Sequence, residues 1–257
     1  MNSENAIELD DVSVARGGRR IWCHGTFSVP AGARVAVIGP NGSGKTTLFE
    51  LLLGLVAPLE GSVRVLGQVP RRGNDKIGYV PQDYASSVGE AVRCRDLVAL
   101  GLTGLRWGLR PQSESEKRRV SEVLEAVGIA ELADRRMSHL SGGQQQRAAI
   151  AQAIVGEPEL LLLDEPLSNL DASSQRDVVS LTGEIGARTG ATILVVSHDL
   201  GPLLPILTGA VYLLDGHAHY DEIGAGVDSE LMRHLYGSGV RVVHTAQGDL
   251  FTPEERR

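Results

Sequence analysis

Apolar residues in the first third of the chain form short runs that predict β-strands separated by turns. Ile7–Val14 alternates loosely between apolar and polar positions, which indicates a strand, and Gly17-Gly18 follows as a turn. A second strand is expected at Thr26–Val29, just before the tight turn Pro30-Ala31-Gly32. The same pattern predicts three further strands, at Arg34–Ile38, Ser62–Leu66 and Ile77–Val80.

The strand predicted at Arg34–Ile38 is apolar on both faces and leads through a glycine-rich loop into an apolar helix, Thr46–Leu55. A strand buried on both faces is typical of a parallel sheet with helices on each side. The same alternation returns late in the chain. There we expect strands at Leu160–Leu163, Thr192–Val196 and Val211–Leu214, and a helix at Gln175–Thr189.

Between these two parts the pattern changes, because residues 83–140 carry helical periodicity without strand signals. Helices are expected at Glu90–Leu100, Ser115–Val127 and Glu131–Asp134, followed by an apolar-patterned segment at Gln145–Val155. We therefore expect one domain over residues 1–240. Its core would be about residues 1–82 and 157–240, its helical insertion about residues 83–156, and a tail would follow at 241–257, polar and frayed from about Phe251.

Composition narrows the class of protein. A net charge of −7 argues against general nucleic-acid binding, and the cysteines Cys23 and Cys94 form no CxxC pair, which fits a reducing compartment without a cysteine metal site. The first residues hold no basic region followed by an apolar stretch, so we expect no secretory signal. Apolar runs such as Leu160–Leu163 are too short to cross a bilayer, so any link to a membrane would come through a partner.

The glycine-rich loop matches the phosphate-binding pattern GxxxxGK[ST] over residues 39–46. It stands after a strand and before a helix, where backbone N–H groups and the positive end of the helix dipole can hold phosphate oxygens. Lys45 would supply a charge for the β- and γ-phosphates, and the Thr46 hydroxyl would bind Mg²⁺. The alternative is a glycine turn that only caps a helix.

A second motif, Leu160-Leu161-Leu162-Leu163-Asp164-Glu165-Pro166, places two acids after an apolar strand. Ligands of open α/β sheets gather at the carboxyl ends of the strands. Asp164 would hold Mg²⁺ directly or through water, and Glu165 would orient or deprotonate an attacking water. On its own, the motif could also be a strand that ends in a solvated acidic turn.

The third motif is Leu140-Ser141-Gly142-Gly143-Gln144, which precedes an apolar helix. Ser141 with Gln144 has the form of a capping box, and the two glycines leave backbone N–H groups open at a helix N-terminus. This sequence, 20 residues before the Asp-Glu pair, is the signature of ABC ATPases. The chain resembles that family over about residues 7–235.

The resemblance implies a fold and a set of site residues. The fold is an α/β P-loop NTPase core, a mostly parallel sheet with helices on both faces, with an N-terminal antiparallel β subdomain and an inserted α-helical signature subdomain. Glu165, His198 and Lys45 are implied to be catalytic. The implied Mg²⁺ ligands are Thr46, Gln82 and Asp164. The implied ATP-binding residues are Arg16, Gly39, Pro40, Asn41, Gly42, Ser43, Gly44, Lys45, Thr46, Thr47 and Gln82.

Two positions depart from the family pattern. An aromatic residue usually stacks on adenine after the first strand, but Arg16 stands there in this chain; a guanidinium can also stack on a base. Trp22 is nearby in the sequence, and we expect it to pack in the interior. Thr208-Gly209-Ala210 replaces a common acidic-basic pair, for which the sequence offers no functional reason.

The family mechanism implies a dimer and membrane partners. Ser141, Gly142, Gly143 and Gln144 would cap the ATP held by a partner subunit, and Asp171 would reach across the dimer interface. One chain carries every motif, so a homodimer is the simplest expectation. We also expect integral membrane permease subunits, docked between Gln82 and Ser87–Leu100, a solute-binding protein, and a place on the cytoplasmic face of the membrane.

Finer resemblance concerns the cargo. Arg106–Pro111, Ser141–Arg147 and Ser197–Pro202 with Leu203-Leu204-Pro205 look like the ATPases of zinc/manganese-type metal importers. The histidines His217, His219, His234 and His244 are scattered and do not themselves indicate metal binding. Two alternatives stay open: an ABC transporter ATPase for another substrate, imported or exported, and a soluble ABC ATPase acting on nucleic acid or ribosomes. The second usually has two cassettes, coiled coils or zinc modules, which this sequence lacks.

Overall fold

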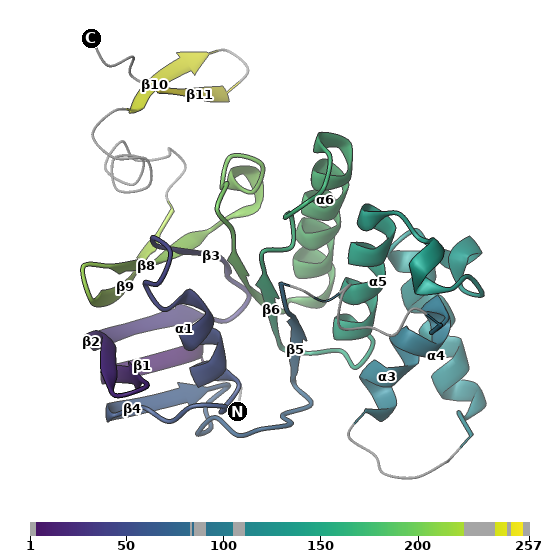
Figure 1. The fold of residues 1–257 in the computed structure, drawn as a ribbon, viewed down its shortest axis with the longest axis horizontal. Coiled ribbons are helices and arrows are strands. Elements are labelled where there is room, and N and C mark those ends of the chain that lie inside the picture. The colour runs from purple at the N-terminus through teal and green to yellow at the C-terminus, as the bar shows by residue number, and fades with distance from the viewer. Residues whose placement is uncertain are drawn as a thin grey trace.

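A six-stranded sheet forms the centre of the molecule (Figure 1). The computed structural model describes residues 4–82, 84, 91–104, 111–223, 240–245 and 248–253. The strands lie in the order β5-β6-β7-β3-β8-β9, all parallel except β9, which runs antiparallel to β8. Their bounds are β3 Arg34–Ile38, β5 Ile77–Val80, β6 Leu160–Asp164, β7 Thr192–Val196, β8 Gly209–Leu214 and β9 His217–Glu222.

Both faces of this sheet are covered, because its central strands carry apolar residues on both faces. In β6, Leu160 and Leu162 face one core with helix α1 (Lys45–Leu52), whereas Leu161 and Leu163 face the other with α6 (Ala172–Thr189). Strand side chains alternate between faces, so one run of leucines joins two cores. The expected parallel sheet with helices on both faces is confirmed.

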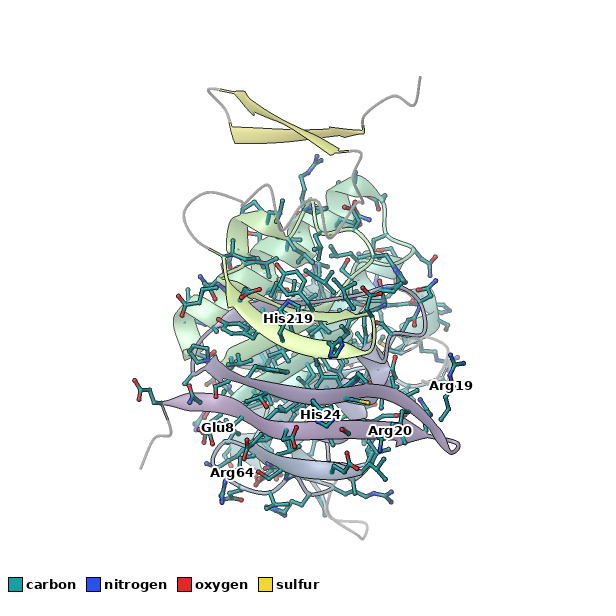
Figure 2. All side chains as sticks on the ribbon, turned by 90° about the vertical axis from the view of Figure 1, so that its left-hand side faces the viewer. Glu8, Arg19, Arg20, His24, Arg64 and His219 are labelled. Carbon is teal, nitrogen blue, oxygen red and sulfur yellow. The ribbon has the colours of Figure 1, made fainter. Side chains whose placement is uncertain are left out.

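An antiparallel sheet extends the core that contains α1. Its order is β2-β1-β4, with β1 at Asn5–Arg16, β2 at Arg19–Pro30 and β4 at Glu60–Val65. The side chains of Glu8, Arg20, His24 and Arg64 project from it toward the viewer in Figure 2. The expected N-terminal antiparallel subdomain is therefore present, and Trp22 packs inside it with 1% of its surface exposed.

The inserted region is helical, as the periodicity predicts. It holds α3 (Cys94–Thr103), α4 (Glu114–Ala126), the short 3₁₀ turns η1 (Ala130–Leu132) and η2 (Met137–His139), and α5 (Gly142–Ile154). Both α4 and α5 begin with a capping box, at Ser113 with Glu116 and at Ser141 with Gln144. In the described part of the chain, every helix is too short or too polar to span a bilayer.

Several element bounds differ from the sequence prediction. The helix expected at Glu90–Leu100 begins at Cys94, because Arg93 forms an isolated β-bridge with Arg136. Glu90 lies outside the described residues. The helix expected at Glu131–Asp134 is only the 3₁₀ turn η1. Helix α1 ends at Leu52 because Gly54 takes a left-handed conformation with φ 67.

Several strands are longer than predicted or were not predicted at all. Strand β2 begins at Arg19, far before Thr26, since it pairs along the whole of β1. Strand β9 was not predicted, because most of its residues are polar. The tail expected to be frayed from Phe251 instead forms a hairpin of β10 (Val240–Thr245) and β11 (Gly248–Pro253).

The departure at Thr208-Gly209-Ala210 has a structural reason. The Thr208 hydroxyl accepts a hydrogen bond from the Arg34 backbone at 2.9 Å, which fixes the entry to β8 beside β3. A Cβ at Gly209 would lie 2.5 Å from the ring of Tyr220 in β9. The glycine therefore leaves room for the side chain that anchors the edge strand.

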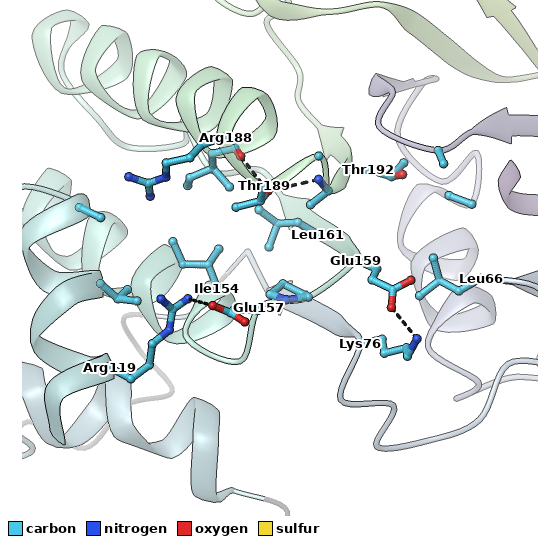
Figure 3. Close-up of a pocket in the computed structure, with 18 of the residues that line it drawn as sticks. Leu66, Lys76, Arg119, Ile154, Glu157, Glu159, Leu161, Arg188, Thr189 and Thr192 are labelled. Carbon is cyan, nitrogen blue, oxygen red and sulfur yellow. Dashed lines mark hydrogen bonds and ion pairs between the residues drawn. The ribbon is translucent and has the colours of Figure 1, made fainter. Parts of the chain in front are cut away.

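A cavity of about 880 Å³ opens at the edge of the sheet where the parallel strands begin (Figure 3). Leu161 and Thr192 line it near the starts of β6 and β7, and Arg119 of α4 and Arg188 of α6 line its sides. The ion pairs Lys76–Glu159 and Arg119–Glu157 lie at its margin. The cavity therefore separates α4 from the last turns of α6, at the opposite edge from the phosphate loop.

Candidate active site

The phosphate loop joins β3 to α1, and its glycines are held in place by packing on one side. Gly44, directly before α1, has φ 100, and a Cβ there would lie 2.4 Å from Cγ2 of Ile21. A Cβ at Gly39 would lie 2.4 Å from the Leu213 carbonyl oxygen. Gly42 has φ 82 and nothing within 4 Å of its Cβ position. The loop is thus packed against Ile21 and Leu213 on one side, and it is open at Gly42, where a phosphate would approach.

Lys45 lies folded back over this loop. Its Nζ donates hydrogen bonds to the carbonyl oxygens of Gly39 at 2.8 Å and Pro40 at 3.1 Å. Burial lowers the pKa of Lys45, while the nearby carboxylates of Glu165 and Asp164 act in the opposite direction. The ammonium is therefore close to both acids and already partly desolvated, so little further desolvation is needed to meet an anion.

The two acids follow one another at the carboxyl end of β6. Asp164 is 5% exposed and lies opposite Val196 of β7. Burial, and secondarily the charge of Glu165, raise the pKa of Asp164 to about 6, against the opposing effects of Lys45 and His198. Burial disfavours the ionised form of this carboxyl, and a bound cation would stabilise that form.

Glu165 has an uncommon backbone conformation for a residue other than glycine, with φ 52. Its backbone N–H still donates to the Val196 carbonyl oxygen at 2.9 Å, so the turn begins just past the ladder. Such strained positions gather at functional sites. The turn directs the buried carboxylate toward the segment that follows β7.

His198 stands in that segment and contacts Glu165 twice. The His198 backbone N–H donates to Oε2 of Glu165 at 3.3 Å, and its Nε2 lies 3.1 Å from Oε1 without hydrogen-bond alignment. The imidazole is 59% exposed. The predicted catalytic residues Lys45, Glu165 and His198 therefore gather with Asp164 at the carboxyl ends of β3, β6 and β7.

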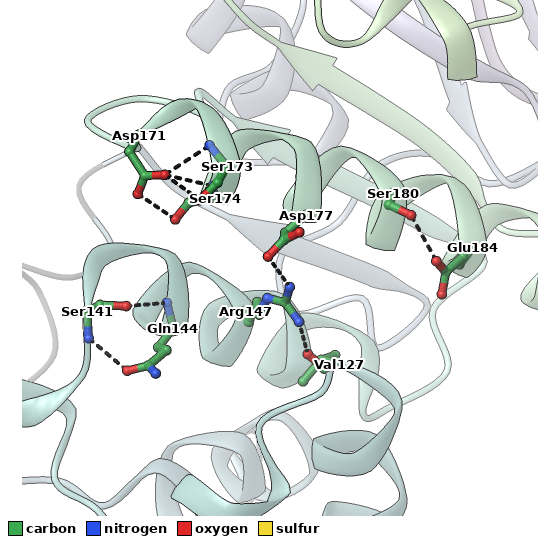
Figure 4. Close-up of polar contacts among 10 residues, drawn as sticks. All are labelled: Val127, Ser141, Gln144, Arg147, Asp171, Ser173, Ser174, Asp177, Ser180 and Glu184. Carbon is green, nitrogen blue, oxygen red and sulfur yellow. Dashed lines mark hydrogen bonds and ion pairs between the residues drawn. The ribbon is translucent and has the colours of Figure 1, made fainter.

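The signature residues form the first turn of α5 (Figure 4). The Ser141 hydroxyl accepts from the Gln144 backbone at 3.3 Å, and the Ser141 N–H donates to Oε1 of Gln144 at 2.9 Å. Ser141 and Gly142 are exposed. The amide of Gln144 therefore serves the helix cap, and the open face of the turn is made by the serine and the glycines.

Asp171 is the N-cap of α6. Its carboxylate accepts hydrogen bonds from the backbone and the hydroxyl of both Ser173 and Ser174, at 2.7 to 3.0 Å (Figure 4). These bonds, those from Ser174 first, hold the pKa of Asp171 well below its usual range. An ionised carboxylate at this position stabilises the start of the helix.

Two residues of the antiparallel sheet support the loop, and sequence reasoning missed their part in the site. A Cβ at Gly44 would lie 3.0 Å from Cδ1 of Trp22 and closer still to Ile21, so both side chains form the wall behind the loop. Arg16, at the end of β1, forms an ion pair of 3.0 Å with Glu50 of α1. The pair holds the guanidinium beside the helix that begins with Lys45.

The remaining predicted residues lie on exposed segments around the site. Gln82 is exposed in the turn after β5, and Pro40, Asn41 and Thr46 are exposed on the phosphate loop, whereas Thr47 is buried. Trp107 and its neighbours, residues 105–110, lie outside the described residues, as do Ser87 and the side chains of His234 and His244. Of the permease groove expected at Ser87–Leu100, the structure therefore describes only residues 91–100.

The acidic side chains at this site suit Mg²⁺ that is also bound by phosphates and water, rather than a metal ion held by protein side chains alone. In the described ranges no three His, Cys, Asp or Glu side chains gather as a metal cluster. Mg²⁺ is usually held by one or two carboxylates together with substrate phosphates and water. Asp164, buried and with its raised pKa, is the carboxylate that such an ion would fit.

Comparison with known families decides the class. The profile of the ABC transporter family matches residues 24–168, more than half of the chain. The chain belongs to the ABC transporter family. It is an ATP-binding subunit and an ATPase of this family, and the resemblance predicted from the phosphate loop, the Asp-Glu pair and the signature is confirmed.

Individual ABC proteins extend the similarity beyond the family profile. The zinc transport system ATP-binding protein TroB of Treponema pallidum is 38% identical over 76% of this chain and 73% of its own length. The phosphonates import ATP-binding protein PhnC of Stutzerimonas stutzeri is 35% identical over 91% of this chain and 90% of its own. A solved inward-facing putative metal-chelate type ABC transporter matches with TM-score 0.83 at 26% identity, covering 97% of both chains.

Proposed function

We propose that this chain is the ATP-hydrolysing subunit of an ABC importer for a divalent metal, zinc or manganese. The observation that carries the proposal is the 38% identity to a zinc transport ATP-binding protein. The likeness to a metal-chelate type transporter along nearly the whole chain supports it. The segment from Ser197 to Pro205, which resembles metal importers in sequence, joins the candidate site directly at His198.

In this proposal the residues at the carboxyl ends of the parallel strands carry the reaction. The N–H groups of residues 39–47 and Lys45 hold the β- and γ-phosphates of ATP, and Lys45 exchanges its two loop carbonyls for phosphate oxygens. Glu165 orients and deprotonates the attacking water, and His198 steadies the Glu165 carboxylate and contacts the γ-phosphate. Mg²⁺, held by Thr46, Gln82 and Asp164, would neutralise charge on the phosphates.

The site is completed by a second copy of the chain. The exposed first turn of α5, with Ser141, Gly142 and Gly143, presents open backbone N–H groups at a helix N-terminus, which suits the γ-phosphate of a partner's ATP. Asp171, exposed at the neighbouring start of α6, lies at the same interface. Two chains in a head-to-tail dimer would hold two ATP molecules, and hydrolysis would separate them.

The proposed partners beyond the second copy are integral membrane permease subunits and a solute-binding protein. Permeases would hold the ATPase at the cytoplasmic face of the membrane, with the dimer's motion transmitted through the helical insertion, about residues 83–156. The rest of the single domain, about residues 1–82 and 157–240, would carry the nucleotide. No nucleic acid is part of this proposal.

The proposal is tested by whole-cell elemental content. Cells with the native chain and cells with Glu165→Gln are grown under metal limitation, and zinc, manganese and iron are measured together. Glu184→Gln, an exposed change on α6, serves as the control. A selective fall in zinc or manganese in the Glu165→Gln cells supports metal import. Unchanged metals, with the variant confirmed inactive as an ATPase, would remove the metal assignment.

A second candidate cargo is phosphonate, because the phosphonate import ATP-binding protein aligns over 91% of this chain. The same two strains are grown with a phosphonate as the sole phosphorus source. Growth that depends on Glu165, with unchanged metal content, favours this alternative. Growth that is equal in both strains leaves metal as the better-supported cargo.

A further inference from the structure

Helices α5 and α6 begin side by side, and their first turns are in close contact (Figure 4). A Cβ at Gly143 would lie 2.8 Å from the Ser174 hydroxyl and 3.0 Å from its Cβ. Ser174 is itself held, because both its backbone N–H and its hydroxyl donate to Asp171. The signature turn thus rests on a fixed surface of α6.

One turn further along α5, the Arg147 side chain bridges three helices. Its Nη1 donates to the Val127 carbonyl oxygen at the end of α4 at 2.9 Å, and its Nη2 donates to Oδ2 of Asp177 on α6 at 2.8 Å. The arginine side chain is 24% exposed, in contrast to 61% for Asp177. The guanidinium is therefore mostly enclosed, with its two ends committed to different elements.

The turn after α4 is shaped for this guanidinium. Gly128 follows Val127 with φ 70, and a Cβ at Gly128 would lie 2.9 Å from Nη1 of Arg147. A residue with a side chain would therefore suffer backbone strain and would also press on the arginine. The glycine leaves room for the arginine to reach the carbonyl.

Toward the far end of α6, a cavity separates this helix from the last turn of α4. The cavity of about 880 Å³ lies between Val123 and Ala126 of α4 and Ile185 and Arg188 of α6 (Figure 3). The contact of Gly143 with Ser174 and the ion pair of Arg147 with Asp177 both lie in the first half of α6, away from this cavity. Loss of the Arg147 bonds would leave the first turns of α5 free to shift relative to the start of α6.

We propose that Arg147 is a positioning residue that sets the orientation of the signature turn relative to the start of α6. The inference rests on the proposed function, in which Ser141, Gly142 and Gly143 contact the ATP of a second copy. Arg147 touches no phosphate in this arrangement. It fixes α5 through Val127 on one side and Asp177 on the other, so the signature turn and Asp171 meet the partner as one unit.

The chemistry requires arginine rather than any cation. A planar guanidinium presents several N–H donors in a fixed fork, so it can serve Val127 and Asp177 together. A lysine ammonium is a single point on a flexible stem and reaches only one of the two in a given conformation. Arg147→Lys should therefore restore part of the activity lost in Arg147→Met.

The experiment uses the full-length chain with Arg147→Met, Arg147→Lys and Asp177→Asn. Glu184→Gln is the matched control, since it breaks the exposed Ser180–Glu184 hydrogen bond of 3.0 Å on the same helix without touching α5. For each variant, kcat and KM for ATP are measured, together with the Kd for a methylanthraniloyl ATP analogue and the midpoint of thermal unfolding. The phosphate loop joins β3 to α1, whereas these changes lie on α5 and α6, so the Kd reports the nucleotide site of the same chain.

The expected result is a kcat about tenfold lower in Arg147→Met, an intermediate value in Arg147→Lys, and a Kd within about twofold of the native value. Asp177→Asn keeps the Val127 bond, so its kcat should fall less, by about threefold. Should Arg147→Met fail to fold, Asp177→Asn and Arg147→Lys decide the question. A kcat within about twofold of native in these variants, or a fall in kcat matched by Glu184→Gln or by an equal loss of analogue binding, would overturn the inference.

Failure of this inference is distinguishable from failure of the proposed function. If the native chain hydrolyses ATP and Glu165→Gln abolishes it while the Arg147 variants stay native-like, only the positioning role falls. If Glu165→Gln hydrolyses ATP at the native rate, the proposed mechanism falls first, and the positioning role falls with it.

Discussion

His198 contacts both oxygens of the Glu165 carboxylate, with its backbone N–H 3.3 Å from Oε2 and its Nε2 3.1 Å from Oε1. The contact depends on the order of the sheet, because β6 and β7 are neighbours and both residues follow their strands. The hydrogen bond to Oε2 anchors one oxygen of the carboxylate, and Oε1 stays close to the imidazole without an aligned hydrogen bond. The pair is thereby prepared to orient a water molecule.

Glu165→Gln should remove hydrolysis while keeping ATP binding. The amide keeps the shape of the side chain but cannot accept a proton, so kcat should fall by about 100-fold or more. ATP should then trap a dimer, which size-exclusion chromatography with light scattering would detect. Native protein without nucleotide is the control, and a mutant that stays monomeric with ATP would contradict the two-chain site.

Asp164 predicts a specific dependence of stability on pH. Its pKa is raised from 3.8 to about 6, so the folded protein holds this proton more tightly than the unfolded chain does. The contribution to stability is fully present below the unfolded pKa and is lost as the pH rises through about 6. Asparagine cannot ionise, so Asp164→Asn keeps the stability that the native protein loses when Asp164 ionises. Without nucleotide or Mg²⁺, the variant should be more stable than native by at most about 3 kcal/mol near pH 8.

The measurement is denaturant unfolding at several pH values between about 4 and 8. The gain from Asp164→Asn should shrink as the pH falls below about 6 and nearly vanish at the lower end. Asp10→Asn, an exposed carboxylate on β1, is the matched control and should show no such trend. Equal stability of Asp164→Asn and native protein at pH about 8 would contradict the raised pKa.

Gly44→Ala should destabilise the fold as well as the phosphate loop. The residue combines φ 100 with a Cβ position 2.4 Å from Ile21, so both backbone strain and overlap result. We expect a loss of about 2 to 4 kcal/mol in the free energy of unfolding. Gly190→Ala separates the two causes, since Gly190 has φ 68 but nothing within 4 Å. It should cost only about 1 kcal/mol, and an equal cost for both changes would show that the overlap is relieved.

Because Arg16 stands where an aromatic residue usually stacks on adenine, we expect weak recognition of the base that a substitution at this position can strengthen. The guanidinium is 58% exposed and its ion pair with Glu50 is solvated, so the pair itself adds little stability. Arg16→Tyr should tighten ATP binding by about three- to tenfold, because an aromatic ring stacks on a base more favourably. Arg19→Tyr, in the same hairpin, is the control. Competition between ATP and GTP measures selectivity, and no gain in affinity with Arg16→Tyr would remove Arg16 from the base site.

Much of the central sheet could be predicted because its strands are continuous apolar runs between turn signals. The bounds of β3, β5 and β7 agree with the sequence prediction to the residue. Strand β9 was missed since His217–Glu222 is mostly polar, and only Ala218 is buried in it. Its conformation comes from pairing with β8, a tertiary cause that no local pattern records.

The site divides in the same way. Asp164 ends β6, His198 follows β7 closely, and Lys45 begins the helix after the loop that follows β3. The sheet therefore brings the three residues together, and motif spacing is enough to find them. The wall formed by Ile21 and Trp22 could not be found from spacing, because it belongs to a different sheet. A signal was nonetheless present, since a tryptophan and an isoleucine interrupt an otherwise polar segment before Thr26.

The packing of Trp22 against the phosphate loop gives the protein an internal optical probe. The indole is 1% exposed, and its N–H has no hydrogen-bond partner among the residues that the structure describes. A Cβ on Gly44 would lie 3.0 Å from the indole. Indole emission shifts with local polarity and hydrogen bonding, so any rearrangement of the loop around an anion reaches this chromophore directly. With Trp107→Phe, Trp22 becomes the single tryptophan of the chain. Nucleotide arrival could then be followed in real time by stopped-flow emission, without a label on either molecule.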